Sequence, residues 1–215
     1  KYTLNFKYTQ QFLNIAFYFM IQFISHIILK IAGWKMTGRL PEDVKTAVFI
    51  AAPHTSNWDF VFGRAGLYQL GIKKINFLIK KELFKFPLGP IIRILGAIPV
   101  DRRKNNNAIS EVGKMFKQNK NLFLLITPEG TRKLVTQWKK GYYQIAMNAG
   151  VPIVLTYVDY GKKEGGIGPV LYPTGNYEED FKFIVDFYKT KTAKFPENFN
   201  LSKQDTIGIK KEETE

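Results

Sequence analysis

The sequence predicts an α/β fold, a single domain with a mixed, mostly parallel sheet flanked by helices, preceded by an N-terminal membrane-associated helical segment. Short apolar, β-branched runs alternate along the chain with segments of helical periodicity. Polar clusters follow three of these runs, and α/β sheets usually bind ligands at the carboxyl ends of their strands. The length of 215 residues suits one such domain. We assign residues 1–38 to the helical segment, 39–201 to the α/β domain and 202–215 to a charged tail, which we expect to be disordered.

Strands are expected, in chain order, at residues 47–51, 75–79, 97–100, 122–126 and 151–158. The run 122–126 is wholly apolar, so we expect it near the centre of the sheet. Helical segments are expected at 60–70, 82–94 (broken by prolines), 107–117, 142–149 (ended by Gly150) and 176–188 (opened by a capping box). The glycine-rich residues 161–168 are expected to form a flexible loop.

The formal net charge of +14 favours anionic partners, which include phospholipid, nucleic acid and an acidic carrier protein. The absence of cysteine excludes disulfides, a thiolate nucleophile and a Cys-based metal site. We expect no metal at all, because one histidine near scattered carboxylates does not make a divalent-cation site.

The N-terminal residues 12–29 form an uncharged stretch of eighteen residues, close to the roughly 20 that a membrane-spanning helix needs. Uncharged polar side chains recur in and just before this stretch every three or four positions: Gln11, Asn14, Tyr18, Gln22, Ser25 and His26. We therefore predict a helix embedded in one leaflet, with protein or headgroups on one side and lipid on the other. This monotopic protein would lie on the anionic cytoplasmic face of the inner (plasma) membrane. A signal peptide is disfavoured because no small-x-small cleavage site follows, whereas a core helix of a soluble fold stays open.

The chain is organised around the stretch 51–59, which follows an apolar strand and precedes a helix. With His54 in the loop and Asp59 in the first helical turn, capped by Thr55, Ser56 or Asn57, the carboxylate would accept the Nδ1 proton of His54. Nε2 would then be free to act as a general base near neutral pH. Neither side chain is expected in the core. The alternative is that Asp59 is only a favourable anion at a helix start and His54 a surface residue.

Two further polar clusters and one apolar run complete a series of four ordered blocks. The blocks are His54-Thr55-Ser56-Asn57-Trp58-Asp59, Gly96-Ala97-Ile98-Pro99-Val100-Asp101-Arg102, Pro128-Glu129-Gly130-Thr131-Arg132 and Val151-Pro152-Ile153-Val154. Together they resemble the glycerolipid acyltransferase superfamily, which includes bacterial 1-acylglycerol-3-phosphate acyltransferases and carries an HX4D motif. The resemblance covers roughly residues 45–160, the usual span of a catalytic domain. Three residues depart from common family patterns: Thr55, Trp58 and Lys133.

The resemblance implies transfer of an acyl group from acyl-CoA or acyl-carrier protein to the hydroxyl of a membrane lyso-lipid such as 1-acylglycerol-3-phosphate. His54 would be the base and Asp59 its orienting group, with no cofactor besides the thioester donor. Backbone N–H groups near the His54 loop are the default oxyanion donors. The residues implied to bind the acceptor's phosphate or polar head are Arg102, Glu129, Gly130, Thr131 and Arg132. Lys81 is a further candidate for that role, with a solvated surface lysine as the alternative.

Two other classes of protein were weighed against an enzyme. A nucleic-acid-binding protein would explain the positive charge and the basic residues among aromatics, but not the uncharged N-terminal stretch or the strand-end blocks. A lipid-binding scaffold without catalysis would give the His54/Asp59 pair no role. The enzyme is therefore favoured and no nucleic acid is expected as a partner. A lyso-aminolipid acceptor stays open beside lysophosphatidic acid, and the oligomeric state is undetermined by the sequence.

Overall fold

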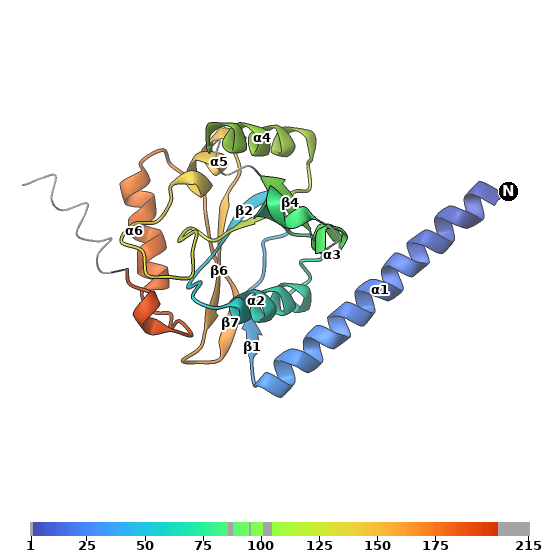
Figure 1. Cartoon of the computed structure of the whole chain (residues 1–215), viewed down its shortest axis with the longest axis horizontal. Coiled ribbons are helices and arrows are strands. Elements are labelled where there is room, and N and C mark those ends of the chain that lie inside the picture. The colour runs from blue at the N-terminus through green and yellow to red at the C-terminus, as the bar shows by residue number, and fades with distance from the viewer. Residues whose placement is uncertain (1, 86–87, 95, 101–104, 202–215) are drawn as a thin grey trace, which may run out of the picture.

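Seven strands form one sheet in the order β1-β7-β6-β2-β5-β3-β4 in the computed structural model, which describes residues 2–85, 88–94, 96–100 and 105–201 (Figure 1). Their bounds are β1 Lys35–Thr37, β2 Ala47–Ala51, β3 Asn76–Lys80, β4 Ala97–Val100, β5 Phe123–Ile126, β6 Ile153–Asp159 and β7 Glu164–Leu171. Strands β2 to β6 run parallel, whereas β7 is antiparallel to β6 and β1 pairs in parallel with β7. This arrangement confirms the predicted single α/β domain with a mixed, mostly parallel sheet.

Helices cover both faces of this sheet (Figure 1). Their bounds are α1 Tyr2–Ala32, α2 Asn57–Gln69, α3 Leu88–Ile94, α4 Asn105–Gln118, α5 Gly141–Ala149 and α6 Tyr177–Tyr188, with short 3-10 helices at Lys81–Phe84 and Pro196–Asn198. Helices α4, α5 and α6 share one core cluster with the sheet, and α2 contributes to the cluster on the opposite face.

The central strand β2 is buried on both faces because helices pack on each side of it. Val48 and Ile50 point into the cluster under α4, α5 and α6, and Ala47 and Phe49 into the cluster under α2. A parallel strand between two helical layers is expected to be continuously apolar, as this one is. Strand β5, expected near the centre, pairs directly with β2.

Two predictions about the sheet are wrong. The sheet begins at β1, ahead of residue 47, and residues 164–168 of the expected glycine-rich loop 161–168 belong to strand β7. The glycines serve close strand packing there, since a Cβ on Gly166 would lie 2.0 Å from the carbonyl oxygen of Thr37 on β1. Sequence alone gives these glycines the appearance of a loop, because the neighbouring strand that requires them is far away in the chain.

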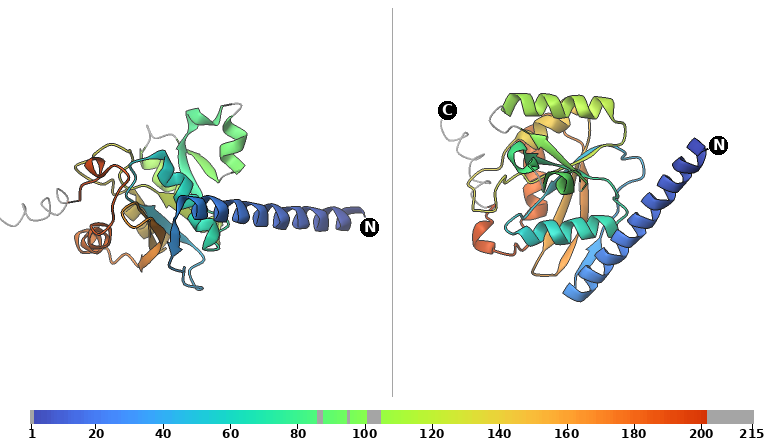
Figure 2. Two further views of the ribbon diagram at one scale, coloured as in Figure 1. Left: turned by 90° about the horizontal axis from the view of Figure 1, so that it is seen from below. Right: turned by 45° about the vertical axis from the view of Figure 1, so that its right-hand side comes forward.

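Helix α1 packs on α2 near its C-terminal end and projects away from the domain at its N-terminal end (Figure 2). Between residues 16 and 32 most of its side chains are exposed, so the core-helix alternative is wrong. The C-terminal end of the uncharged polar stripe faces protein: Ser25 is buried, and Nδ1 of His26 lies 2.8 Å from Nε2 of Gln69 on α2. Leu29 anchors the helix by packing with Ala65 of α2. Within the described residues, no helix combines the length and apolarity needed to cross a bilayer.

Candidate active site

The edge of the sheet where β2 ends brings three chain segments together. Strand β2 lies between β5 and β6 and runs parallel to both, so the residues that follow these three strands meet at one edge. Those residues are the loop 52–56, the segment 127–132 and Tyr160. The predicted strand-end clusters around His54 and Glu129 are therefore neighbours in space.

The start of helix α2 is capped by Ser56, one of the three predicted capping residues. Its hydroxyl oxygen accepts a hydrogen bond from the N–H of Trp58 at 3.2 Å, and the N–H of Ser56 donates to Asp59 at 2.7 Å. This is a capping box, which stabilises the first helical turn and orients the Asp59 carboxylate back toward the loop. The side chain of Ser56 is thus engaged in capping α2.

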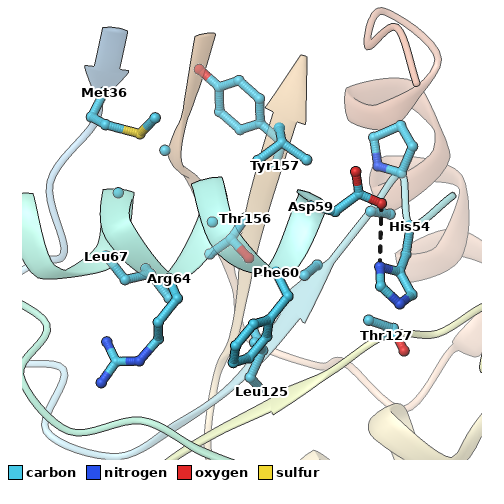
Figure 3. Close-up of a pocket in the computed structure, with 17 residues that line it drawn as sticks. Met36, His54, Asp59, Phe60, Arg64, Leu67, Leu125, Thr127, Thr156 and Tyr157 are labelled. Atoms are coloured by element: carbon cyan, nitrogen blue, oxygen red, sulfur yellow. Dashed lines mark ion pairs between the residues drawn. The ribbon is translucent and has the colours of Figure 1, made fainter. Parts of the chain in front are cut away.

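His54 and Asp59 face one another as predicted, with Nδ1 of His54 3.4 Å from Oδ2 of Asp59 (Figure 3). Oδ2 also accepts hydrogen bonds from the N–H groups of Thr55 and Ser56, and Oδ1 accepts one from the hydroxyl of Tyr160 at 2.8 Å. No described residue bonds Nε2 of His54. The arrangement leaves that nitrogen available as a base, while the carboxylate can stabilise an imidazolium.

Asp59 is only 7% exposed, so the expectation that it lies outside the core is wrong. The carboxylate tolerates burial because it accepts three hydrogen bonds. Tyr160, which donates one of them, has a raised pKa because it is buried and because its hydroxyl bonds the Asp59 carboxylate. His54 lies closer to the surface, with about a quarter of its side chain (23%) exposed.

Glu129 is turned inward, toward the His54 loop. It is 4% exposed, and both of its carboxylate oxygens accept the N–H of His54, at 2.9 and 3.2 Å. Burial raises the pKa of Glu129 to about 8, with a further contribution from the negative charge of Asp59, while the His54 N–H opposes the shift. This carboxyl therefore anchors the histidine by its backbone, a contact that the expected acceptor-binding role did not include.

The backbone donors of the His54 loop are already engaged. The N–H of His54 bonds Glu129, and those of Thr55 and Ser56 bond Asp59. The default expectation that these N–H groups hold an oxyanion is therefore wrong for residues 54 to 56.

Three of the predicted acceptor-binding residues lie at the exposed rim beside this loop. Thr131 and Arg132 are exposed, and the guanidinium of Arg132 donates to the side-chain oxygen of Asn57, the first residue of α2. Gly130 has a φ of +68°, and Lys139 packs so closely over it that a Cβ would lie 3.0 Å from the Lys139 ammonium. Two cations, one of them not predicted, thus border the mouth of the site.

Two predicted residues remain, and only Lys81 is among the described residues. Lys81 is exposed at the start of the 3-10 helix after β3, at the same edge of the sheet. Arg102, with its neighbours 101–104, lies outside the described residues. Among the residues that are described, no group of three or more His, Cys, Asp or Glu could hold a metal ion.

An apolar pocket, partly open to solvent, runs between α2 and the sheet, with His54 and Asp59 at one end (Figure 3). Met36 lies at the other end, and Arg64 bonds the backbone carbonyls of Ile72 and Lys73. The walls are mainly apolar and include Phe60, Gly63, Gly66, Leu67, Leu125 and Val158. Such a pocket suits an aliphatic chain whose reactive end reaches the His54/Asp59 pair.

Sequence reasoning missed three side chains near the site. Tyr160 follows β6 directly, so the strand-end rule that found His54 could have found it as well. Lys139 lies outside the predicted blocks and is placed by packing over Gly130, whereas Lys194 is placed by packing against Trp58, which is distant in sequence.

Comparison with known proteins identifies similarities of sequence and of fold. A family model described as "Acyltransferase" matches residues 35–158. No curated protein sequence matches the chain significantly. The crystal structure of the 1-acyl-sn-glycerophosphate (LPA) acyltransferase PlsC from Thermotoga maritima is similar, with a TM-score of 0.55 and 19% identity over 90% of this chain and 79% of that chain.

Proposed function

Since the family match spans more than half of its residues, the chain belongs to the acyltransferase family, and we propose that it transfers a fatty acyl group from an acyl thioester to the hydroxyl of a lyso-lipid. The donor would be acyl-CoA or acyl-carrier protein, and the acceptor a lyso-lipid such as 1-acylglycerol-3-phosphate. The observation that carries this proposal is the His54–Asp59 pair at 3.4 Å, at one end of an apolar pocket.

In the proposed reaction His54 first accepts a proton from the acceptor hydroxyl and later donates it to the leaving thiolate. Its Nε2 takes the proton of the acceptor hydroxyl, whose oxygen attacks the carbonyl carbon of the thioester. The tetrahedral intermediate collapses, the C–S bond breaks, and the thiolate takes the proton back from Nε2 and leaves as a free thiol. Asp59 stabilises the imidazolium between these steps, and no group of the protein is acylated. No metal or cofactor takes part in this scheme.

The pocket supports an acyl substrate because its walls are apolar. Burying a long alkyl chain there would contribute about 0.8 kcal/mol for each methylene removed from water. Gly63 leaves space beside α2, whereas Gly66 allows Met36 to pack closely against the helix at the far end from His54. A fatty acyl chain held in this pocket would place its thioester carbonyl next to His54.

The headgroup of the lyso-lipid acceptor is proposed to bind at the exposed rim beside the His54 loop, where Arg132 and Lys139 lie. Arg132 presents a planar fork of donors, which suits a phosphate, and Thr131 and Lys139 lie beside it. Lys81 and Arg102 remain candidates for the same headgroup. Glu129 is proposed to act through His54, because its carboxyl is turned to the backbone of that residue.

The function is tested by product analysis. Purified protein is incubated with palmitoyl-CoA or palmitoyl-acyl-carrier protein and with a panel of lyso-lipids that differ only in headgroup, and products are identified by mass spectrometry. We expect a diacyl product with at least one acceptor that is absent with His54→Ala. Thioester hydrolysis alone, with no acylated lipid from any acceptor, would contradict the proposal.

We expect Arg132→Ala to raise KM for an anionic acceptor by roughly 10- to 100-fold, because a charge-assisted contact to phosphate is worth about 1.5–3 kcal/mol. KM for the thioester donor should change little, since Arg132 lies at the rim and not along the apolar pocket. Steady-state kinetics with each substrate varied in turn separates the two constants.

Arg39→Ala provides the control for Arg132. Arg39 is equally charged, pairs with no described residue other than the nearby Glu42 and precedes β2, at the opposite end of that strand from His54. It should leave both KM values unchanged. A similar loss for donor and acceptor in Arg132→Ala would mean that Arg132 supports the loop 52–57 through Asn57 and does not bind the headgroup.

We also propose that α1 inserts into the surface of a membrane, where the lyso-lipid resides. Its exposed face carries large apolar side chains, among them Phe19 (62% exposed), Phe23 (65%) and Ile31 (82%). Apolar insertion and attraction of a basic protein to anionic lipid would act together. The proposed location is the cytoplasmic face of the inner membrane, with acyl thioester and anionic lipid as the partners and no nucleic acid.

Replacing Phe19, Phe23 and Ile31 together with serine should make membrane binding sensitive to salt. Each side chain contributes about 2 kcal/mol of burial that salt does not weaken, whereas the basic attraction falls with ionic strength. Wild-type protein should stay on phosphatidylglycerol-containing vesicles in high salt, and the triple variant should sediment with them only in low salt. Leu29 is left in place because it anchors α1 on α2.

The control for this experiment replaces Tyr172 and Phe183, which are also large and exposed but lie just after β7 and on α6. That double serine variant should bind like wild type. Release of the wild-type protein from these vesicles by salt alone would refute insertion of α1.

A further inference from the structure

Three aromatic rings surround the ammonium group of Lys194 beside the proposed active site. The Lys194 Nζ lies 5.3 Å from the ring of Trp58, 5.9 Å from that of Tyr160 and 5.8 Å from that of Phe195. Aromatic rings that converge on one cation in this way form an aromatic cage. No described carboxylate lies within ion-pair distance of Lys194, so its charge is not neutralised by an acidic neighbour.

The cage shares its walls with the proposed catalytic pair. Trp58 directly precedes Asp59 in α2, and the hydroxyl of Tyr160 donates to Oδ1 of Asp59 at 2.8 Å. The third wall is tied to the same loop, because the N–H of Phe195 donates to the hydroxyl oxygen of Thr55 at 3.2 Å. A ligand at Asp59 and His54 would therefore have the cage at its side.

Packing against further aromatic side chains holds the rings of the cage in place. Trp58 stacks on Phe62 at 5.7 Å, Phe62 stacks on the buried Trp34 at 4.7 Å, and Trp34 packs edge-on against Tyr160 at 4.9 Å. Trp58 is nevertheless 51% exposed and Phe195 42% exposed, so the outer side of the cage is accessible. A rigid and accessible set of rings next to a reactive centre is suited to select a ligand.

Aromatic cages are the usual receptors for quaternary ammonium groups such as choline. Here the chain's own ammonium already occupies the position that such a headgroup would take. A cationic headgroup would have to displace Lys194 and would be repelled by its charge, whereas a phosphate without an amine would be attracted.

We propose that Lys194 fills this cage in order to make the acyltransferase selective for lyso-lipids whose headgroup is anionic and carries no cationic amine. The inference rests on the proposed lyso-lipid acyl transfer and names the class of acceptor. It favours a glycerophosphate-type headgroup over an aminolipid one, and it gives a role to Trp58, where the sequence departs from the common family pattern.

Lys194→Ala and Lys194→Met test this selectivity, with Lys191→Ala as the matched control. Lys191 makes the same kind of contact, over Tyr157 at 4.1 Å and Phe187 at 4.8 Å, but away from the cage. The measured quantity is the ratio of kcat/KM for 1-acylglycerol-3-phosphate to that for the matching phosphocholine lyso-lipid, with acyl-CoA as donor.

We expect the wild-type ratio to favour the phosphate acceptor and the Lys194→Ala ratio to fall by roughly 100-fold, from about a tenfold loss on the anionic acceptor and about a tenfold gain on the choline acceptor. Lys194→Met removes the charge but refills the cage, so it should show only the loss on the anionic acceptor. Lys191→Ala should keep the wild-type ratio. An unchanged ratio in both Lys194 variants, or an equal shift in Lys191→Ala, would overturn the inference.

Binding of tetramethylammonium, measured by calorimetry, tests the cage without any turnover. We expect binding to Lys194→Ala and none to wild type or Lys191→Ala. If wild type acylates no lyso-lipid at all, the proposed function fails. The binding measurement still tests whether the cage accepts a quaternary ammonium group when Lys194 is removed. Failure of Lys194→Ala to bind tetramethylammonium, with its thermal stability close to that of wild type, would overturn the cage as a selectivity device.

Discussion

His54→Ala is expected to lower kcat by roughly 10²- to 10⁴-fold, the usual contribution of a positioned general base. The fold should survive, since the His54 side chain is partly exposed and is held to the rest of the protein mainly by its backbone. The measurement is thiol release from acyl-CoA in the presence of a lyso-lipid, together with a thermal melt. His26→Ala is the control, because His26 is the other histidine and bonds Gln69 on the far side of α2.

Asp59→Asn should reduce kcat to a similar degree but should also destabilise the protein. An amide has one acceptor oxygen, whereas the Asp59 carboxylate accepts hydrogen bonds from three donors through both of its oxygens. At least one buried donor would then lose its partner, at a cost of about 1–3 kcal/mol. Turnover near the wild-type level in either variant would exclude the proposed mechanism.

Glu129→Gln is expected to change how the free energy of unfolding depends on pH. Burial raises the pKa of Glu129 in the folded protein to about 8, while in the unfolded chain the carboxyl titrates near its ordinary value of 4.5. Below that value the group is protonated in both states, so it does not oppose folding. Between about 4.5 and 8 the unfolded chain releases a proton that the folded protein retains, so stability falls as pH rises, and above about 8 the loss is complete.

Glutamine cannot ionise, so the variant should lose this decline, which is on the order of a few kcal/mol across the interval. Denaturant unfolding of wild type and Glu129→Gln at several pH values between 5 and 9 measures it. The two proteins should differ little at pH 5, and the variant should become the more stable one as pH rises. Parallel pH profiles would show that Glu129 is ionised in the folded protein at neutral pH.

The same residue should affect turnover through the position of His54. Glutamine can still accept the N–H of His54, so Glu129→Gln should keep most of kcat. Glu129→Ala removes the acceptor and should lower kcat by roughly 10- to 100-fold with little change in either KM, because a base displaced by a fraction of an ångström is less effective. A selective rise in the acceptor KM with glutamine would instead restore the headgroup-binding role implied by the family resemblance.

Elements with a strong local pattern could be predicted from the sequence. The apolar runs of β2 and β5 and the periodic helix α4 were predicted within two residues of their ends, because alternation and periodicity are properties of a few successive side chains. The sequence predicts a loop over residues 161–168, which includes most of strand β7, and it does not predict β1. The glycines of β7 allow close approach to β1 and β6, and β1 itself has only three residues, so the pattern that defines both strands lies in their pairing.

The sequence by itself determined the parts of the site that are local. His54, Ser56 and Asp59 lie within six residues, so a strand end followed by a capped helix brings them together whatever the rest of the chain does. Only the tertiary structure decided that Glu129 holds the backbone of His54, that Tyr160 bonds Asp59 and that Lys194 lies in a cage of aromatic rings. The first two contacts join residues 75 and 101 positions apart, and Lys194 lies 136 positions from Trp58. The order of the strands in the sheet, together with the packing of the segment after α6, brings these residues to one edge.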